Sequence, residues 1–225
     1  MTTRSQRTGN LSYVLAKRPA EFGYWSEQFV AACIHALEFD YVLTKRALQE
    51  FNGLAVTHWF HFVAQNAGAD RVALWRQGGH SPEAMEARAQ ATLQIPRMPS
   101  PKAISDVFDR DKYRCRYCRV PVVPKSVMKL LSAKSGIELG KMKTNLQTHG
   151  AHWIHCATID HVHPHALGGL NTPENIVTSC NACQYGKGKY TLSDLRLELR
   201  PPTRDLHVMK RSWVETIHGL ISLSQ

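Results

Sequence analysis

Four of the six cysteines form two pairs, Cys115 with Cys118 and Cys180 with Cys183, and two residues separate the members of each pair. This spacing lets both sulfurs of one turn reach the same ion, and Zn²⁺ prefers four thiolates in a tetrahedral arrangement. In an intracellular protein, two such pairs are more typical of a zinc site than of disulfide bonds. Because four sulfurs leave no open coordination position, the sequence predicts a structural zinc ion here. The alternative interpretation is a set of buried free thiols.

Between the two pairs lie the adjacent residues Asp160 and His161, followed by Pro164 and Gly168-Gly169. Neighbours in a strand point to opposite faces, so one side chain could bind a metal ion while the other faces a water molecule. A neutral imidazole can take a proton from that water near pH 7. A hard divalent cation can stabilise the charge on the leaving oxygen of a phosphodiester. In isolation, a strand histidine beside a surface aspartate would be the preferred interpretation, but the position between two cysteine pairs, with Pro164 and Gly168-Gly169 behind it, favours a functional pair.

The chain of 225 residues carries a formal net charge of +10, and its basic residues are denser after Pro99. This balance favours an anionic partner, most simply nucleic acid, although a charged surface can also serve solubility alone. Lys187 is a candidate contact to a phosphate or a leaving group, or else an ordinary surface lysine. Lys189 and Arg196 could follow the DNA backbone, where each positive charge adds salt-dependent affinity.

The ordered set of these motifs resembles the HNH endonucleases of the four-cysteine type. The pattern of that family runs CxxC, DHxxPxxxGG, Asn, CxxC and Lys-Gly, and here it falls at residues 115–118, 160–169, 175, 180–183 and 187–188. The resemblance covers about residues 107–195, less than half of the chain. It implies a ββα-metal core, in which a β-hairpin and the helix after it grip one divalent metal ion.

The resemblance also implies roles for single residues. Asp160 would be a ligand of a catalytic Mg²⁺ or Mn²⁺, and His161 would be the general base. Asn175 would bond the backbone of the loop and hold His161 in position, and the products would carry a 5′ phosphate. At Gln184 the chain departs from the family, which normally has Asn or His there as the second metal ligand. The Gln184 oxygen could ligate the metal through one extra methylene, hold a water molecule, or fail to bind.

Three functions follow from these residues. The first is a metal-dependent DNA endonuclease with catalytic residues Asp160, His161, Asn175 and Gln184. The alternative is a zinc-stabilised nucleic-acid-binding protein with impaired catalysis, in which Gln184 marks a lost metal site. A third and weaker hypothesis is a toxin or defence effector whose helical half senses a trigger or binds an inhibitor.

The elements that must position these residues predict an α+β protein: a ββα-metal nuclease core with a zinc knuckle, preceded by a mainly helical part. Residues 1–100 are predicted to form a mainly helical domain of unknown role, and residues 101–200 the nuclease domain with an insertion at about 122–152. Residues 201–225 are predicted to form a helical tail. The predicted helices are Ser26–Glu50, Leu54–Asn66, Ser81–Leu93, Lys102–Asp109, Lys125–Ser135, Thr191–Leu199 and Ser212–Leu223, with a linker at 95–101 and a β-like segment at Thr158–His163.

The hydrophobic fraction of 43% is ordinary for a globular protein. No apolar run approaches the roughly 20 residues that cross a membrane, and the N-terminus has no apolar stretch typical of a secretory signal. We therefore expect a soluble cytoplasmic protein with DNA as its partner. A homodimer and a protein partner for the N-terminal half are further hypotheses.

Overall fold

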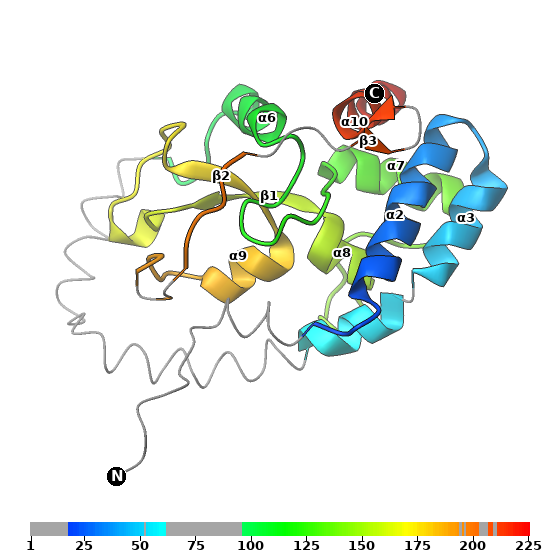
Figure 1. The fold of residues 1–225 in the computed structure, drawn as a ribbon, viewed down its shortest axis with the longest axis horizontal. Coiled ribbons are helices and arrows are strands. Elements are labelled where there is room, and N and C mark those ends of the chain that lie inside the picture. Colours follow the sequence, from blue (N-terminus) through cyan, green and yellow to red (C-terminus); the bar gives the residue numbers. More distant parts are fainter. Residues whose placement is uncertain are drawn as a thin grey trace, which may run out of the picture.

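The computed structural model describes residues 18–51, 53–61, 96–193, 195, 197–202, 207–208 and 211–225. Within these ranges a small antiparallel sheet lies on one side and a group of helices on the other (Figure 1). This mixture of helices with a two-stranded sheet confirms the predicted α+β class. The predicted helix Ser81–Leu93 lies outside the described residues.

The sheet and the helix that follows it form a continuous ββα unit. Strand β1 (Ala157–His161) pairs antiparallel with β2 (Ile176–Cys180), and Ala157 lies opposite Cys180 while His161 lies opposite Ile176. Helix α9 (Asn181–Lys187) begins directly after β2, because the sulfur of Cys180 accepts a hydrogen bond from the Cys183 amide and caps the helix. The loop between the strands contains a short 3₁₀ helix, η1 (His165–Leu167).

The N-terminal half begins with two helices, α2 (Phe22–Leu37) and α3 (Tyr41–Glu50). The prediction of one helix over Ser26–Glu50 is therefore wrong. Phe39 adopts a left-handed backbone conformation with φ of 61°, which ends the first helix. The side chain of Asp40 then accepts a hydrogen bond from the Leu43 amide at 2.9 Å and starts the second. Residues 53–61 are also helical, as predicted for the start of the segment 54–66.

The C-terminal half adds α6 (Pro101–Arg110), α7 (Lys125–Ser135), α8 (Gly150–His155), α10 (Trp213–Leu223), and a two-residue hairpin of β3 (His207–Val208) and β4 (Arg211–Ser212). Helices α6, α7 and α10 agree with the predicted bounds within one residue. The predicted helix Thr191–Leu199 is wrong for its described residues, which form turns. The Thr191 and Ser193 hydroxyl groups bond each other at 2.8 Å, a local contact that competes with helix formation.

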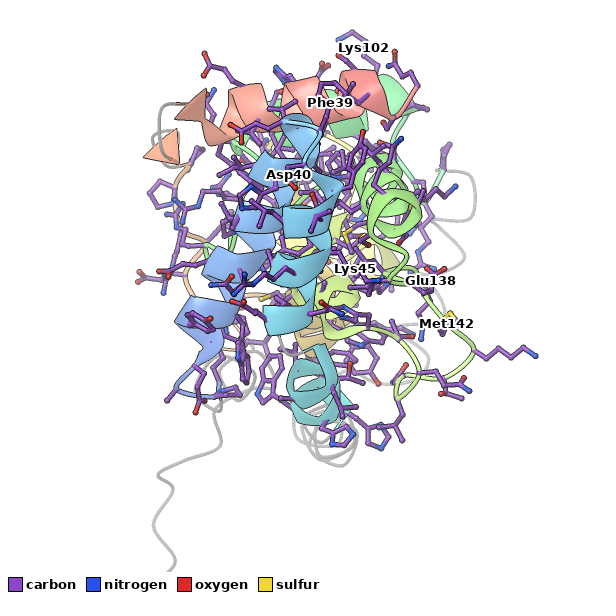
Figure 2. The ribbon with its side chains drawn as sticks, turned by 90° about the vertical axis from the view of Figure 1, so that its right-hand side faces the viewer. Phe39, Asp40, Lys45, Lys102, Glu138 and Met142 are labelled. Atoms are coloured by element: carbon purple, nitrogen blue, oxygen red, sulfur yellow. The ribbon has the colours of Figure 1, made fainter. Side chains whose placement is uncertain are left out.

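The two halves of the described chain share one hydrophobic core. Helices α2 and α3 pack against α7, and α10 packs against both α2 and α7, as Figure 1 and the rotated view of Figure 2 show. Phe29 of α2 is fully buried and stacks on His155 of α8, with 4.1 Å between ring centroids. The segment 122–152 thus supplies α7 and α8 to the core, and the division into domains at residue 100 stays a prediction.

Candidate functional site

The four cysteines of the two pairs meet in one buried cluster. Their sulfur atoms all lie within 4.8 Å of one another, and the sulfurs of Cys118 and Cys180 are 3.8 Å apart. A tetrahedral zinc ion with Zn–S bonds of about 2.3 Å requires sulfur separations of about 3.8 Å. The cluster therefore fits a structural zinc ion in size and in ligand chemistry. Among the described residues it is the one group of three or more such ligands that could hold a metal ion.

Backbone hydrogen bonds bring the first pair to the second. The Cys115 amide donates to Val120 O at 3.0 Å, and the Arg119 amide donates to Cys115 O at 2.9 Å, which closes a tight turn. Arg119 takes a left-handed conformation with φ of 68°. The Arg116 amide donates to Thr178 O at 2.8 Å and joins this turn to β2. The turn places Cys115 and Cys118 beside the pair that begins α9.

Electrostatics around the cluster favour the thiolate form of Cys118, whereas burial raises the pKa of Cys180 and the hydrogen bonds with the other thiols raise that of Cys183. Burial acts to raise the pKa of Cys118, but hydrogen bonds from the other three thiols and the charge of Arg18 outweigh it and lower that pKa well below its usual value. Burial also acts to lower the pKa of Arg18, and the thiolate charges of Cys118 and Cys183 reverse this and raise it. The Arg18 guanidinium lies 4.2 Å from the ring centre of Phe22 on α2 and interacts with Cys118, so the N-terminal half supplies a cation to the cluster.

Asp160 is held inside the protein by two donors on one oxygen. The hydroxyl of Tyr117 donates to Asp160 Oδ2 at 2.6 Å, and Lys187 Nζ lies 3.3 Å from the same atom. Lys187 is fully buried and also donates to the carbonyl of His161 at 2.7 Å. Burial raises the pKa of Asp160 despite the opposing charge of Lys187. Burial, followed by the charge of Asp160, raises the pKa of Tyr117 well above its usual value, so its hydroxyl remains a donor.

His161 is partly buried and oriented by Asn171. Its Nε2 lies 2.7 Å from Asn171 Oδ1, and Asn171 Nδ2 donates to the carbonyl of Pro96. A carbonyl can only accept, so the amide of Asn171 is fixed with its oxygen toward the imidazole, and we assign the ring proton to Nε2. Burial lowers the pKa of His161. The imidazole is therefore neutral near pH 7, and its Nδ1 is the basic nitrogen.

Asn175 closes the loop between β1 and β2. Its Oδ1 accepts from the His163 amide at 2.8 Å, and its Nδ2 donates to His163 O at 3.1 Å and Leu170 O at 2.8 Å. Gly169 lies in the same tight contact, because a Cβ there would approach His163 O to 1.9 Å. Gly169 and Asn175 thus fix the loop that follows His161, and Gly168, with φ of 94°, ends η1 within it.

Gln184 uses both ends of its amide on β1. Its Nε2 donates to Ile159 O at 2.8 Å, and its Oε1 accepts from the Thr158 hydroxyl at 3.2 Å. The residue therefore joins α9 to the strand that carries Asp160. To ligate a metal ion, the amide oxygen would have to exchange the Thr158 hydroxyl for the ion, and the ligand role of Gln184 stays a prediction.

The three basic residues predicted to contact DNA have different surroundings. Lys189 follows α9 and is exposed, whereas Lys187 lies inside the site against Asp160. Arg196 lies outside the described residues. Sequence reasoning missed Tyr117 and Asn171. A polar aromatic side chain between two zinc ligands is a usable signal for Tyr117, but an asparagine in an irregular loop gives none.

Asp160 is the main protein ligand that the site offers to a catalytic divalent ion. Both contacts to Asp160 use Oδ2, and no described residue bonds Oδ1. Mg²⁺ commonly binds proteins through one or two carboxylates and completes its shell with water and substrate phosphates. The chemistry of the donors therefore fits a divalent ion held by Asp160 through Oδ1, with few protein ligands besides.

Residues 155–199 match the model of the HNH endonuclease family. The matched segment contains β1, β2, α9 and the second cysteine pair, and it indicates nuclease activity in general, with nucleic acid as the substrate class. Comparisons with curated proteins and with solved structures give no match. Among the described residues, no helix has both the length and the apolar character needed to cross a lipid bilayer.

Proposed function

We propose that the protein is an endonuclease that hydrolyses phosphodiester bonds of DNA with one divalent metal ion, Mg²⁺ or Mn²⁺. The observation that carries this proposal is His161, a neutral and partly buried imidazole that Asn171 holds beside Asp160 on the first strand of a ββα unit. The match of residues 155–199 to the HNH endonuclease family supports it. The net charge of +10 supports a polyanionic substrate.

In the proposed reaction, His161 Nδ1 accepts a proton from water while Nε2–H stays bound to Asn171. The water oxygen forms a bond to phosphorus and the bond to the 3′ oxygen breaks, which leaves a 5′ phosphate and a 3′ hydroxyl that takes its proton from solvent. Asp160 Oδ1 would hold the divalent ion, which supplies positive charge at the leaving oxygen. Asn175 keeps the loop after His161 closed and so helps to fix the base.

The test is plasmid nicking by the purified protein in Mg²⁺, Mn²⁺ or EDTA, beside the variant His161→Ala. We expect metal-dependent nicking in the wild type, a loss of at least about a hundredfold in the variant, as for removal of a general base, and unchanged DNA binding. His35→Ala is the matched control, because His35 lies in the last turn of α2 and outside the site. Full activity in His161→Ala would refute the assigned base.

The second candidate function is a zinc-stabilised nucleic-acid-binding protein that does not cut. The observation that favours it is Lys187, whose buried ammonium group already neutralises Asp160 at 3.3 Å. The amide of Gln184, bonded to Thr158 and Ile159, points to the same function. A wild type that is inert in every metal but binds DNA, together with a Gln184→His variant that cuts, would establish this alternative.

A further inference from the structure

Four arginines gather around the turn that carries the first cysteine pair. Arg114, Arg116 and Arg119 belong to the turn itself, shown in green between α6 and α7 in Figure 1. Arg200 joins them because Arg116 Nε donates to Arg200 O and the Arg200 amide donates to Arg116 O at 3.2 Å. Arg114 Nε donates to Arg119 O at 2.9 Å. Distant parts of the chain are thus bonded together at one group of cations, which we call the knuckle patch.

The positive charge of the knuckle patch exceeds the negative charge beside it. Asp111 bonds Arg116 at 2.8 Å, but the same carboxylate also bonds Arg110 at 2.9 Å and is shared between two cations. Within the described residues, neither Arg119 nor Arg200 forms an ion pair. Like charges held this close repel one another, so an anion that binds here would relieve the repulsion among these arginines.

The knuckle patch lies close to the candidate active site along the chain. Tyr117, which holds Asp160, stands between Arg116 and Cys118, and Arg119 follows two residues later. Two residues span at most about 7 Å, and an arginine side chain adds to that reach. Successive phosphates of one DNA strand advance by about 3.4 Å along the helix axis. The Tyr117 side chain adds its own length to this separation, so a strand with its scissile phosphate at Asp160 would bring phosphates a few nucleotides away, rather than the adjacent one, towards these arginines.

We propose that the knuckle patch binds the phosphate backbone of the DNA strand that flanks the cleaved bond. This assignment rests on the proposed function, which supplies a DNA strand at Asp160. Guanidinium groups match phosphate geometry with two parallel hydrogen bonds, and the half-buried Arg119 and the exposed Arg200 offer donors that no carboxylate among the described residues uses. An acidic protein segment is the competing partner, and the proximity to the scissile position favours DNA.

The test is the salt dependence of DNA binding, measured by fluorescence anisotropy with a labelled duplex on the non-cutting His161→Ala background. The test variant is Arg119→Gln with Arg200→Gln, which keeps two of the three methylene groups of each side chain and removes two charges. The control variant removes two charges from Lys45 and Arg46 of α3, and Figure 2 shows Lys45 on the side of the molecule formed by α2, α3 and α10. Zinc content and melting temperature check that each variant is folded.

We expect weaker binding in the test variant and a slope of log K against log salt that is smaller by about 1.8, since each lost phosphate contact removes about 0.9. The control variant should keep the wild-type slope, and Arg119→Lys with Arg200→Lys should restore most of it. An unchanged slope in a protein whose wild type cuts DNA would refute the knuckle patch alone. Polyglutamate serves as a model of an acidic protein segment. If the test variant lost binding to polyglutamate but kept its binding to DNA, the knuckle patch would be assigned to an acidic protein partner. A wild type that neither binds nor cuts DNA would refute the proposed function, and the knuckle patch with it.

Discussion

Tyr117→Phe removes one hydroxyl group and keeps the ring that fills the space between the zinc turn and β1. The lost hydrogen bond to Asp160 Oδ2 is 2.6 Å long and almost wholly buried. A hydrogen bond to a charged group contributes about 1.5–3 kcal/mol. If that energy orients the carboxylate in the transition state, kcat should fall by about ten- to a hundredfold, since 1.4 kcal/mol corresponds to a factor of ten.

The assay is the rate of plasmid nicking over a range of substrate and metal concentrations, together with zinc content. We expect a lower kcat, an almost unchanged KM, and a full complement of zinc in Tyr117→Phe. The matched control is Tyr24→Phe, because the exposed Tyr24 hydroxyl bonds Glu50 at 3.2 Å, outside the site. Mn²⁺ binding, followed by electron paramagnetic resonance, gives a second measurement that does not depend on cutting.

Two results would refute this reasoning. One is an unchanged kcat in Tyr117→Phe with zinc bound, which would mean that Lys187 alone is sufficient to orient Asp160. The other is a loss of activity in proportion to a loss of zinc, which would give Tyr117 a purely structural part. A fall in kcat at full zinc content supports a positioning role.

Three further predictions follow from the same contacts. Chelation of zinc, or Cys118→Ser, should lower the melting temperature by many degrees and abolish nicking, and scanning calorimetry with metal analysis checks this. Lys187→Met leaves the buried Asp160 carboxylate without its cation, so the variant should be less stable by about 3 kcal/mol and should gain more thermal stability from Mn²⁺ than the wild type does. Burial holds the pKa of His155 at about 4 in the folded protein, so the unfolded chain takes up the proton first as the pH falls. The contribution of His155 to the free energy of unfolding is complete above about pH 6.5 and falls by up to about 3 kcal/mol as the pH drops towards 4. The urea midpoint of His155→Phe should therefore change less with pH than that of the wild type.

The resemblance of the ordered motifs to the HNH family predicted the ββα unit and the meeting of the two cysteine pairs, although 62 positions separate Cys118 from Cys180, whereas local spacing explains only the geometry within each pair and strand. Two thiols separated by two residues can reach one ion in any tight turn, and an Asp-His pair before Gly-Gly suits a strand that enters a loop. The bounds of α7 and α10 were predictable for a similar reason: Gly136 ends the first with a left-handed residue, and Ser212 caps the second.

Long-range packing decided what the sequence did not reveal. Lys187 has the spacing of a surface lysine, yet α9 turns its ammonium group into the space between Asp160 and the His161 carbonyl. Asn171 acquires its place only when the loop folds back towards Pro96. The break at Phe39 depends on one left-handed residue in a stretch whose apolar spacing continues across it. In the first two cases the deciding contact joins residues that no local pattern connects, and in the third a single backbone conformation decides.

The Tyr117–Asp160 contact and the four-sulfur cluster decide whether residues 155–199 can function when they are moved to another protein. The segment that matches the family, residues 155–199, contains two of the four cysteines and neither Cys115 nor Tyr117. Excised or grafted onto another protein, it would lack half of the zinc ligands and the hydroxyl that holds its carboxylate. A recombination that moves residues 155–199 without the turn at 113–120 would transfer the residues that match the family, but neither the complete zinc site nor the hydroxyl that binds Asp160.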